Sequence, residues 1–221
     1  MSLLDAVVGI GAIPSDTAPQ AEKKRYSERL SAYLAVEVAE GLRAVGFPRM
    51  KPVRGGPGEK AFQGGLGPKK VDVSYSDERH GLLLAVSIKT ITSAPFGKNL
   101  KNRFADLCTE AITLHMRFPY SVVCALFAFP AMADEDVTQG RLVSTFQRAT
   151  KLLATISGRE EYTDPGEKFE QITMMLFQPA MDSVPLPWVR LIDTRTQREM
   201  SEQEYFLELR NILDCCVLAD K

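Results

Sequence analysis

The sequence predicts one α/β domain of three layers, in which helices cover both faces of a central mixed sheet. The first observation is the order of the predicted elements, which runs helix, hairpin, helix, strand, helix, strands and helix. The second is the continuous apolar run at residues 120–129, which suits a central strand covered on both faces. The third is the length of 221 residues, which indicates a single domain. Its core is predicted at about residues 20–195, followed by a last helix at about 202–216.

The N-terminal part begins with a short apolar turn of helix and a loose, Pro-containing segment in residues 1–19. A long helix is predicted over residues 20–45, because Gly46 and Pro48 then act as stop signals. Residues 49–68 are rich in glycine and are predicted to be a loop. This loop is not a phosphate-binding P-loop, because no Gly-Lys-Ser/Thr opens a helix after it.

Two strands are predicted next, joined by a polar turn into a hairpin, and apolar residues alternate along both of them. One face of this hairpin is therefore expected to be buried. The hairpin strands lie at residues 69–74 and 84–89, with the turn at 76–81. The later elements are a helix at 99–118, a strand at 120–129, a helix at 137–156, strands at 171–178 and 188–193, and a helix to about Cys216 that starts with the capping box Ser201-x-x-Glu204.

Asp72 and Lys89 interrupt the apolar pattern of the hairpin, each near the end of its strand. A carboxylate binds a hard cation through oxygen. An ammonium group orients the attacking water or neutralises charge in the transition state of phosphodiester hydrolysis. An acid and a lysine held side by side at a sheet edge therefore predict metal-assisted hydrolysis of phosphodiester bonds.

At these residues the chain resembles the PD-(D/E)XK nucleases, the superfamily of many restriction endonucleases, over about residues 26–130. Asp72 matches the first acid of the motif, and Lys89 matches its lysine. The resemblance implies a restriction-endonuclease-like fold and a deoxyribonuclease that depends on Mg²⁺, with Mn²⁺ able to substitute. It also implies double-stranded DNA as the substrate and a restriction or anti-phage defence setting. A homodimer is implied as well, because cutting both strands needs two sites.

Position 87 departs from the family pattern, because Ser87 stands where the superfamily usually has Glu or Asp. A neutral hydroxyl cannot supply the charge of a metal ligand, so Ser87 contributes at most a hydrogen bond. Some restriction enzymes with Ser-x-Lys recruit a glutamate from the following helix. Otherwise the site is inactive, and the fold serves as a nucleic-acid-binding or assembly subunit. The inactive alternative predicts that Asp72 and Lys89 pair with each other, with no helix carboxylate nearby.

Two glutamates are candidates for the missing carboxylate. Glu110 lies on the flank of the buried face of the second helix, in reach of the sheet edge; its alternative partner is Arg103 on the same helix. Glu37 lies inside the apolar arc of the first long helix, and Glu28 lies beyond the edge of that arc. A buried carboxylate is costly unless it is paired or binds a metal, so the alternative for Glu37 is a salt bridge. The predicted metal ligands are therefore Asp72 with Glu110 or Glu37.

Two basic clusters flank the predicted site and are expected to contact DNA phosphates. The residues concerned are Lys69, Lys70, Lys98, Lys101 and Arg103. The alternative is that these are solvated loop charges, and the net charge of −1 indicates no overall basic field. No helix-turn-helix or zinc module is visible in the sequence. Base recognition would then come from the loops at 49–68 and 157–168, or from a partner protein that supplies specificity or activation.

Other chemistries have less support. His115 is expected to be a hydrogen-bonded core residue and His80 an exposed turn residue, which argues against a zinc site or a histidine base. The four cysteines lack metal-ligand spacing and fit the reduced thiols of a cytoplasmic protein. Neither secretion nor membrane insertion is expected, because residues 1–5 lack a basic leader and no apolar run has membrane-spanning length. An ordinary metabolic α/β enzyme is a third interpretation, but a nucleotide-binding motif is missing.

Overall fold

The computed structural model describes residues 2–56, 58–136, 142–181 and 186–218, with side chains described as far as Cys215. The chain forms a mixed α/β structure, as the sequence predicts. Its elements in chain order are α1 (Leu3–Ile10), α2 (Gln20–Ala44), β1 (Lys60–Gly64), β2 (Gly67–Val71), β3 (Val73–Asp77), β4 (Gly81–Thr90), α3 (Phe96–His115), β5 (Val122–Pro130), α4 (Met132–Glu135), α5 (Thr145–Ala154), β6 (Gln171–Gln178), β7 (Trp188–Asp193), β8 (Glu199–Met200) and α6 (Glu202–Leu218).

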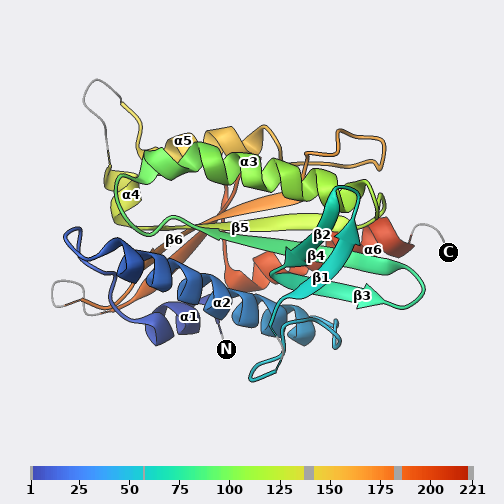
Figure 1. Ribbon diagram of the computed structural model, residues 1–221, viewed down its shortest axis with the longest axis horizontal. Coiled ribbons are helices and arrows are strands. Elements are labelled where there is room, and N and C mark those ends of the chain that lie inside the picture. The colour runs from blue at the N-terminus through green and yellow to red at the C-terminus, as the bar shows by residue number, and fades with distance from the viewer. Residues whose placement is uncertain (1, 57, 137–141, 182–185, 219–221) are drawn as a thin grey trace.

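A six-stranded mixed sheet runs through the middle of the molecule in the order β3-β4-β5-β6-β7-β8 (Figure 1). β3 is antiparallel to β4, whereas β4, β5 and β6 are parallel to one another. β7 and β8 extend the sheet as antiparallel strands. A parallel pair needs a crossover connection, and α3 provides it between β4 and β5.

Helices cover both faces of this sheet, with α1 and α2 on one side and α3 and α5 on the other (Figure 1). β5 shows the reason, because all nine of its residues are buried and successive side chains point to opposite faces. Its even-numbered side chains up to Ala128 pack in one cluster with α1, α2 and α6. Its odd-numbered side chains from Val123 pack in a second cluster with α3 and α5. The predicted central strand is therefore confirmed, and so are the layers.

β4 extends beyond its antiparallel neighbour at one end. β3 pairs with β4 only as far as the Val73–Val86 pair. On its other side, β4 continues to pair with β5 up to the Thr90–Ala128 pair. β3 thus leaves the outer edge of β4 uncovered from Ser87 to Thr90, and we call this stretch the open edge of β4.

The prediction of a loop over the glycine-rich residues 49–68 is partly wrong, because this segment contains β1 and the start of β2. These two strands form a separate antiparallel hairpin. The hairpin packs on α3, where Phe62 and Val71 join the cluster beneath that helix. The Gly65 N–H donates a hydrogen bond to the Thr113 carbonyl at 2.8 Å. The hairpin thus lies close to the C-terminal half of α3.

The prediction of a single strand at residues 69–74 is also wrong, because this segment belongs to two strands, β2 and β3, which meet at Asp72. Val71 ends β2, which pairs with β1, and Val73 begins β3, which pairs with β4. Both valines are fully buried. The apolar alternation therefore continues through Asp72 although the pairing partner changes there, and Asp72 occupies the junction between the two sheets.

The remaining boundaries agree closely with prediction, except at the start of β4, which lies three residues earlier than predicted, and around α3, α5, β8 and the short helix α4, which was not predicted. α3 begins and ends three residues earlier than predicted. α5 begins at Thr145, because Ser144 and Gln147 form a capping box, and residues 137–141 of the predicted helix lie outside the described residues. β8 was not predicted. The capping box before α6 is confirmed, since the Glu204 N–H donates to Ser201 Oγ at 3.2 Å and the Ser201 N–H donates to Glu204 Oε2 at 2.7 Å.

Candidate active site at the open edge of β4

A cavity of about 370 Å³ opens beside the open edge of β4. Its walls come from α2, from the segment before β1, from the β2–β3 junction and from the N-terminal half of α3. The residues that line it are Ser27, Glu28, Ser31, Ala32, Ala35, Val36, Pro52, Val53, Gly55, Gly56, Gly58, Glu59, Asp72, Ile88, Lys89, Thr90 and Arg103. Asp72 and Lys89, predicted from the sequence as neighbours, thus share one cavity.

Asp72 is largely buried and is held against β4 by the backbone. Its Oδ2 accepts a hydrogen bond from the Ile88 N–H at 2.7 Å. Burial raises the pKa of Asp72 to about 6, although Lys89 and the Ile88 N–H act in the opposite direction; Glu110 and Glu59 add to the rise. Asp72 is therefore a carboxyl group with an incomplete set of compensating charges, as expected of a residue that binds a cation or a proton.

Ser87 and Lys89 point from β4 towards α3, because alternate residues of a strand share a face. Ser87 Oγ donates a hydrogen bond to Glu110 Oε1. Lys89 Nζ donates to Glu110 Oε2 at 3.0 Å. Burial would lower the pKa of Lys89, but the Glu110 and Asp72 carboxylates outweigh it and raise that pKa. Lys89 is therefore a fixed positive charge at the cavity wall.

Glu110 is the carboxylate that the second predicted helix brings to this site. It is 1% exposed and accepts hydrogen bonds from Ser87 and Lys89. Lys69 from β2 contributes a second ammonium group, 3.0 Å from Glu110 Oε2. Burial would raise the pKa of Glu110, but Lys89 and Lys69 lower it overall. The intrahelical pair with Arg103 is not what the structure forms, because Arg103 pairs with Asp106. Lys89 forms its ion pair with Glu110, whereas the inactive alternative expected it to pair with Asp72.

Glu37 is buried, as the apolar arc predicts, but it lies outside the cavity lining. Its Oε1 accepts a hydrogen bond from Arg54 Nη2 at 2.6 Å, so the salt bridge considered as its alternative role is confirmed. Glu28, which the helical arc excluded, is the α2 acid that does line the cavity. The side of α2 that faces the cavity is thus the half-exposed flank beside the apolar arc.

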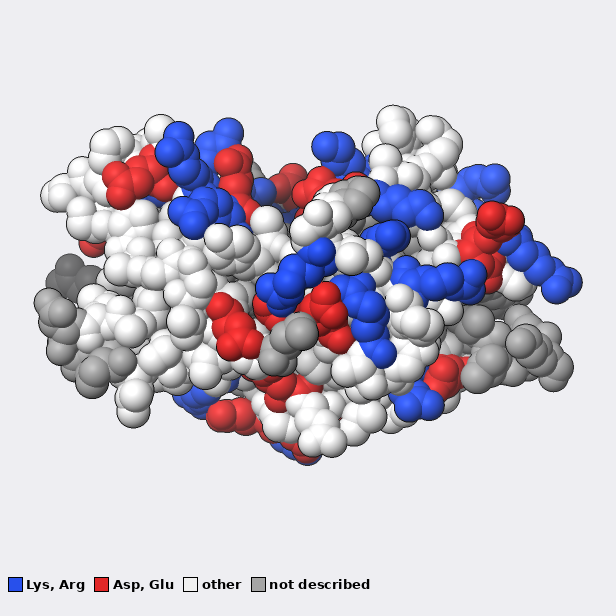
Figure 2. Space-filling model, turned by 90° about the horizontal axis from the view of Figure 1, so that it is seen from below, with Lys and Arg blue, Asp and Glu red and all other residues white. Residues whose placement is uncertain are grey.

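The predicted phosphate-binding residues divide into three groups. Lys69 is bound to Glu110, and Arg103 lines the cavity. Lys70, Lys98 and Lys101 are exposed. In Figure 2, which looks onto the side of the molecule where α1 and α2 lie, basic side chains alternate with acidic ones. The described side chains in this view therefore form no broad basic field, and the cavity lining combines two cations, Lys89 and Arg103, with three acids, Glu28, Glu59 and Asp72.

The oxygen atoms at the open edge are of the kind that a magnesium ion binds. The described residues contain no group of three or more His, Cys, Asp and Glu side chains placed to hold a metal. Mg²⁺, however, commonly takes one or two carboxylates, substrate phosphates and water. Asp72 and Glu110 would supply the carboxylates. The Ile88 carbonyl would add an oxygen, because it points to the same side of the strand as the Ile88 N–H that binds Asp72.

Sequence reasoning missed three contributors to this site: Glu59, the Ile88 carbonyl and the pairing of Lys69 with Glu110. Glu59 and Lys69 come from the region of the β1–β2 hairpin, which was predicted as loop or assigned to the wrong strand. A backbone carbonyl has no signal in a sequence. The glycine pair Gly64-Gly65 next to Gly67 could have indicated a turn between two short strands.

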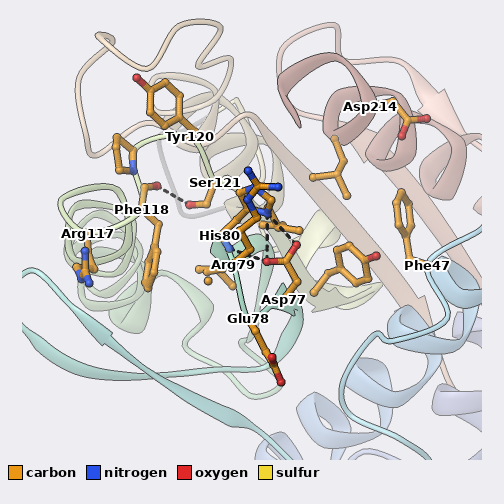
Figure 3. Close-up of a pocket in the computed structure, with 16 residues that line it drawn as sticks. Phe47, Asp77, Glu78, Arg79, His80, Arg117, Phe118, Tyr120, Ser121 and Asp214 are labelled. Carbon is orange, nitrogen blue, oxygen red and sulfur yellow. Dashed lines mark hydrogen bonds and ion pairs between the residues drawn. The ribbon is translucent and has the colours of Figure 1, made fainter. Parts of the chain in front are cut away.

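A second, larger cavity of about 750 Å³ lies at the opposite end of β4. Figure 3 shows His80 and Asp77 facing each other in it, with Phe118 and Tyr120 to one side and Phe47 to the other. His80 Nδ1 lies 2.9 Å from Asp77 Oδ2, and His80 is exposed, as predicted. His115 lies elsewhere in the core, with Nδ1 3.0 Å from the Gly166 carbonyl, which confirms its predicted structural role.

Comparisons of this chain with protein-family models, with curated proteins and with solved structures gave no match. Among the described helices, none has the length and apolar character that crossing a membrane requires. The site is therefore interpreted from its own geometry.

Proposed function

We propose that this protein is an Mg²⁺-dependent endonuclease with a restriction-endonuclease-like fold, which hydrolyses phosphodiester bonds in double-stranded DNA. The supporting observation is that Asp72 and Lys89 line one cavity at the open edge of β4, and that the buried Glu110 behind it is hydrogen-bonded to Lys89. Ser87 donates a hydrogen bond to Glu110, so a carboxylate from the following helix lies next to the position where the family motif has its second acid. The β3–β4 hairpin, the α3 crossover and the parallel strand β5 are consistent with that fold.

The residues have separate roles in this proposal. Asp72 and Glu110 would hold the cation, which when bound neutralises the scissile phosphate and lowers the pKa of the attacking water. Lys89 orients that water and balances the negative charge that develops on the phosphate. Ser87 and Lys69 fix the Glu110 carboxylate through their hydrogen bond and ion pair.

The proposed partners follow from the same reaction. Cutting both strands needs two sites, so we propose a homodimer that acts in restriction or anti-phage defence in the cytoplasm. The exposed Lys70, Lys98 and Lys101 would contact DNA phosphates outside the cavity. Specificity or activation would come from a partner protein or from loops near the cavity.

The test is cleavage of plasmid and phage DNA with Mg²⁺ or Mn²⁺ by the wild type and by Asp72→Ala, Lys89→Ala and Glu110→Gln. Asp77→Ala is the matched control, since Asp77 lies at the other end of the hairpin. The proposal requires metal-dependent cutting that the control retains and the three site variants lose. Losses of a hundredfold or more are expected for groups that stabilise the transition state directly. Equal cutting by wild type and Lys89→Ala would reject the proposed site.

One observation favours a second function, that of an inactive nuclease fold acting as a nucleic-acid-binding or assembly subunit. Both oxygens of Glu110 already have partners: Oε1 accepts from Ser87, and Oε2 is shared by Lys69 and Lys89. If these contacts persist with metal present, Glu110 is structural. The wild type would then bind DNA with the same affinity with and without Mg²⁺ and would not cut it.

A further inference from the structure

We propose that Ser27, Ser31, Thr90 and Arg103 form a subsite for a phosphate group beside Asp72 and Lys89. The inference rests on the proposal that this cavity receives nucleic acid, and it names the part of the substrate that the α2 wall would bind. All four residues line the cavity. They come from three elements, because Ser27 and Ser31 belong to α2, Thr90 ends β4 and Arg103 lies on α3.

Three hydroxyl groups meet at the cavity wall around Thr90. Thr90 Oγ1 lies 2.5 Å from Ser27 Oγ and 3.3 Å from Ser31 Oγ. Serine hydroxyls inside a helix often bond to the carbonyl four residues earlier, but these two approach Thr90 across the helix–strand contact. Each hydroxyl is both donor and acceptor, so the group can direct hydrogens to an anion by giving up bonds among its own members and the bond that Thr90 Oγ1 donates to the Ser27 carbonyl at 3.3 Å. Adjustable donors of this kind suit phosphate oxygens.

The shape of α2 leaves room for a ligand at this point. Ser27, Ser31 and Ala35 are spaced four residues apart, so one row of small side chains runs along the cavity side of the helix, next to the row of Glu28, Ala32 and Val36. Ala35 is nearly buried, whereas Ser27 and Ser31 are half-buried. A larger residue at either serine would fill the cavity next to Lys89. The cavity therefore depends on this pattern.

Two cations, Lys89 and Arg103, lie beside the hydroxyls. Arg103 Nη1 is 3.3 Å from Asp106 Oδ2, in an ion pair that is about half exposed on both sides and therefore weak. Arg103 also acts on Lys89, because its charge opposes the rise in the pKa of that lysine. A phosphate placed between these two cations would relieve their repulsion.

The acids of the same wall, Glu28 and Glu59, lie in exposed ion pairs of their own. Glu28 Oε1 lies 3.6 Å from Lys24 Nζ, and Glu59 Oε2 lies 4.0 Å from Lys70 Nζ. Each acid thus has a basic neighbour outside the cavity. Asp72 is the acid that faces Lys89, and the other carboxylate beside Lys89, that of Glu110, is also paired with Lys69.

The ligand chemistry is a phosphate ester, which nucleic acid offers in two forms: the phosphodiester next to the scissile bond, or a terminal 5′-phosphate. The test measures binding of short duplexes with 5′-phosphate or 5′-hydroxyl ends to the full chain without divalent metal, and competition by inorganic phosphate. The variants are Thr90→Val and the Ser27→Ala/Ser31→Ala double variant. Thr90→Ser retains the hydroxyl, and Thr150→Val is the control, because Thr150 is equally buried on α5 but donates to the Phe146 carbonyl.

The proposal predicts that Thr90→Val and the double variant bind DNA about tenfold more weakly, as expected for lost hydrogen bonds to a charged group. Thr90→Ser and Thr150→Val should bind like the wild type. A loss confined to 5′-phosphorylated duplexes identifies a terminal phosphate, and a loss with both ends identifies the internal phosphodiester. Thermal unfolding measured alongside identifies variants that are merely misfolded. Among folded variants, wild-type affinity of Thr90→Val would overturn the subsite.

This outcome is separate from that of the nuclease proposal, because the measurement is binding without metal rather than cleavage. Weaker binding by Thr90→Val in a wild type that never cuts DNA would keep the subsite and reject the nuclease. Cutting by the wild type together with unchanged binding by Thr90→Val would keep the nuclease and reject the subsite.

Discussion

Asp72 is a buried acid whose charge the fold compensates only in part. Its carboxylate has one strong donor, the Ile88 N–H, and its nearest opposite charge, Lys89, is hydrogen-bonded to Glu110. Glu110 and Glu59 add negative charge from α3 and from the segment before β1. A buried acid with these neighbours holds a proton more tightly in the folded chain than in the unfolded one. The site is therefore built for a positive charge, and this costs stability when none is bound.

The pKa of Asp72 predicts a stability that falls as pH rises. Its folded pKa is about 6, above the value of about 3.9 for an unfolded chain, so the folded state binds more protons between those values. Without metal, stability is lost as pH rises through that window, by up to about 3 kcal/mol. Asp72→Asn should not show this loss, and should be more stable than the wild type near neutral pH. Urea unfolding of both proteins in EDTA, near pH 4.5 and pH 7.5, measures the difference. A difference between the two proteins that is independent of pH would contradict the prediction.

At the scale of elements, the β1–β2 hairpin links α3 to the site. The hairpin brings Lys69 to Glu110 and leads directly into Asp72. It is anchored on α3 by a close approach at Gly64, where an added Cβ would lie 2.5 Å from Thr113 Cγ2 and 2.7 Å from the Thr113 carbonyl oxygen. A strand that approaches a helix so closely has no room for a side chain at that position.

Gly64→Ala is therefore expected to separate the hairpin from α3 and to destabilise the chain by about 1–3 kcal/mol, as overpacking does. Lys69 would move away from Glu110, so faster amide exchange is expected in β1 and β2 than in β5. Gly58→Ala is the matched control, because its added Cβ meets open space among the described residues. Hydrogen exchange with mass spectrometry measures both effects. Equal protection of the hairpin in the two variants would show that Gly64 does not anchor it.

Across the whole molecule, the sequence predicted residues that stand out in a local pattern of apolar and polar positions. It did not predict ion pairs between residues that are distant in the chain. Strand alternation identified Asp72 and Lys89, and the buried flank of α3 identified Glu110. Glu37 was correctly expected to be buried, but its partner, Arg54, lies in a segment without periodicity. The same limit applies to Lys69, because its position depends on the change of strand partner at Asp72. A sequence pattern indicates which face is buried, but it does not identify the residue that meets a buried charge.

Global stability offers a test of cation binding that does not require DNA cleavage. A ligand that binds only the folded state adds about 1.4 kcal/mol when its concentration is ten times the Kd, because the gain is RT ln(1 + [L]/Kd). For a chain of this length, that corresponds to a rise in Tm of roughly 3–5 °C. Protons compete with the cation for Asp72, so the rise caused by millimolar Mg²⁺ should be larger near pH 7.5 than near pH 5.5. Asp72→Asn should show almost none of it, whereas Asp77→Ala, altered at the far end of the hairpin, should respond like the wild type. An equal rise in wild type and Asp72→Asn would place the cation elsewhere, and no rise in any of them would favour the inactive fold.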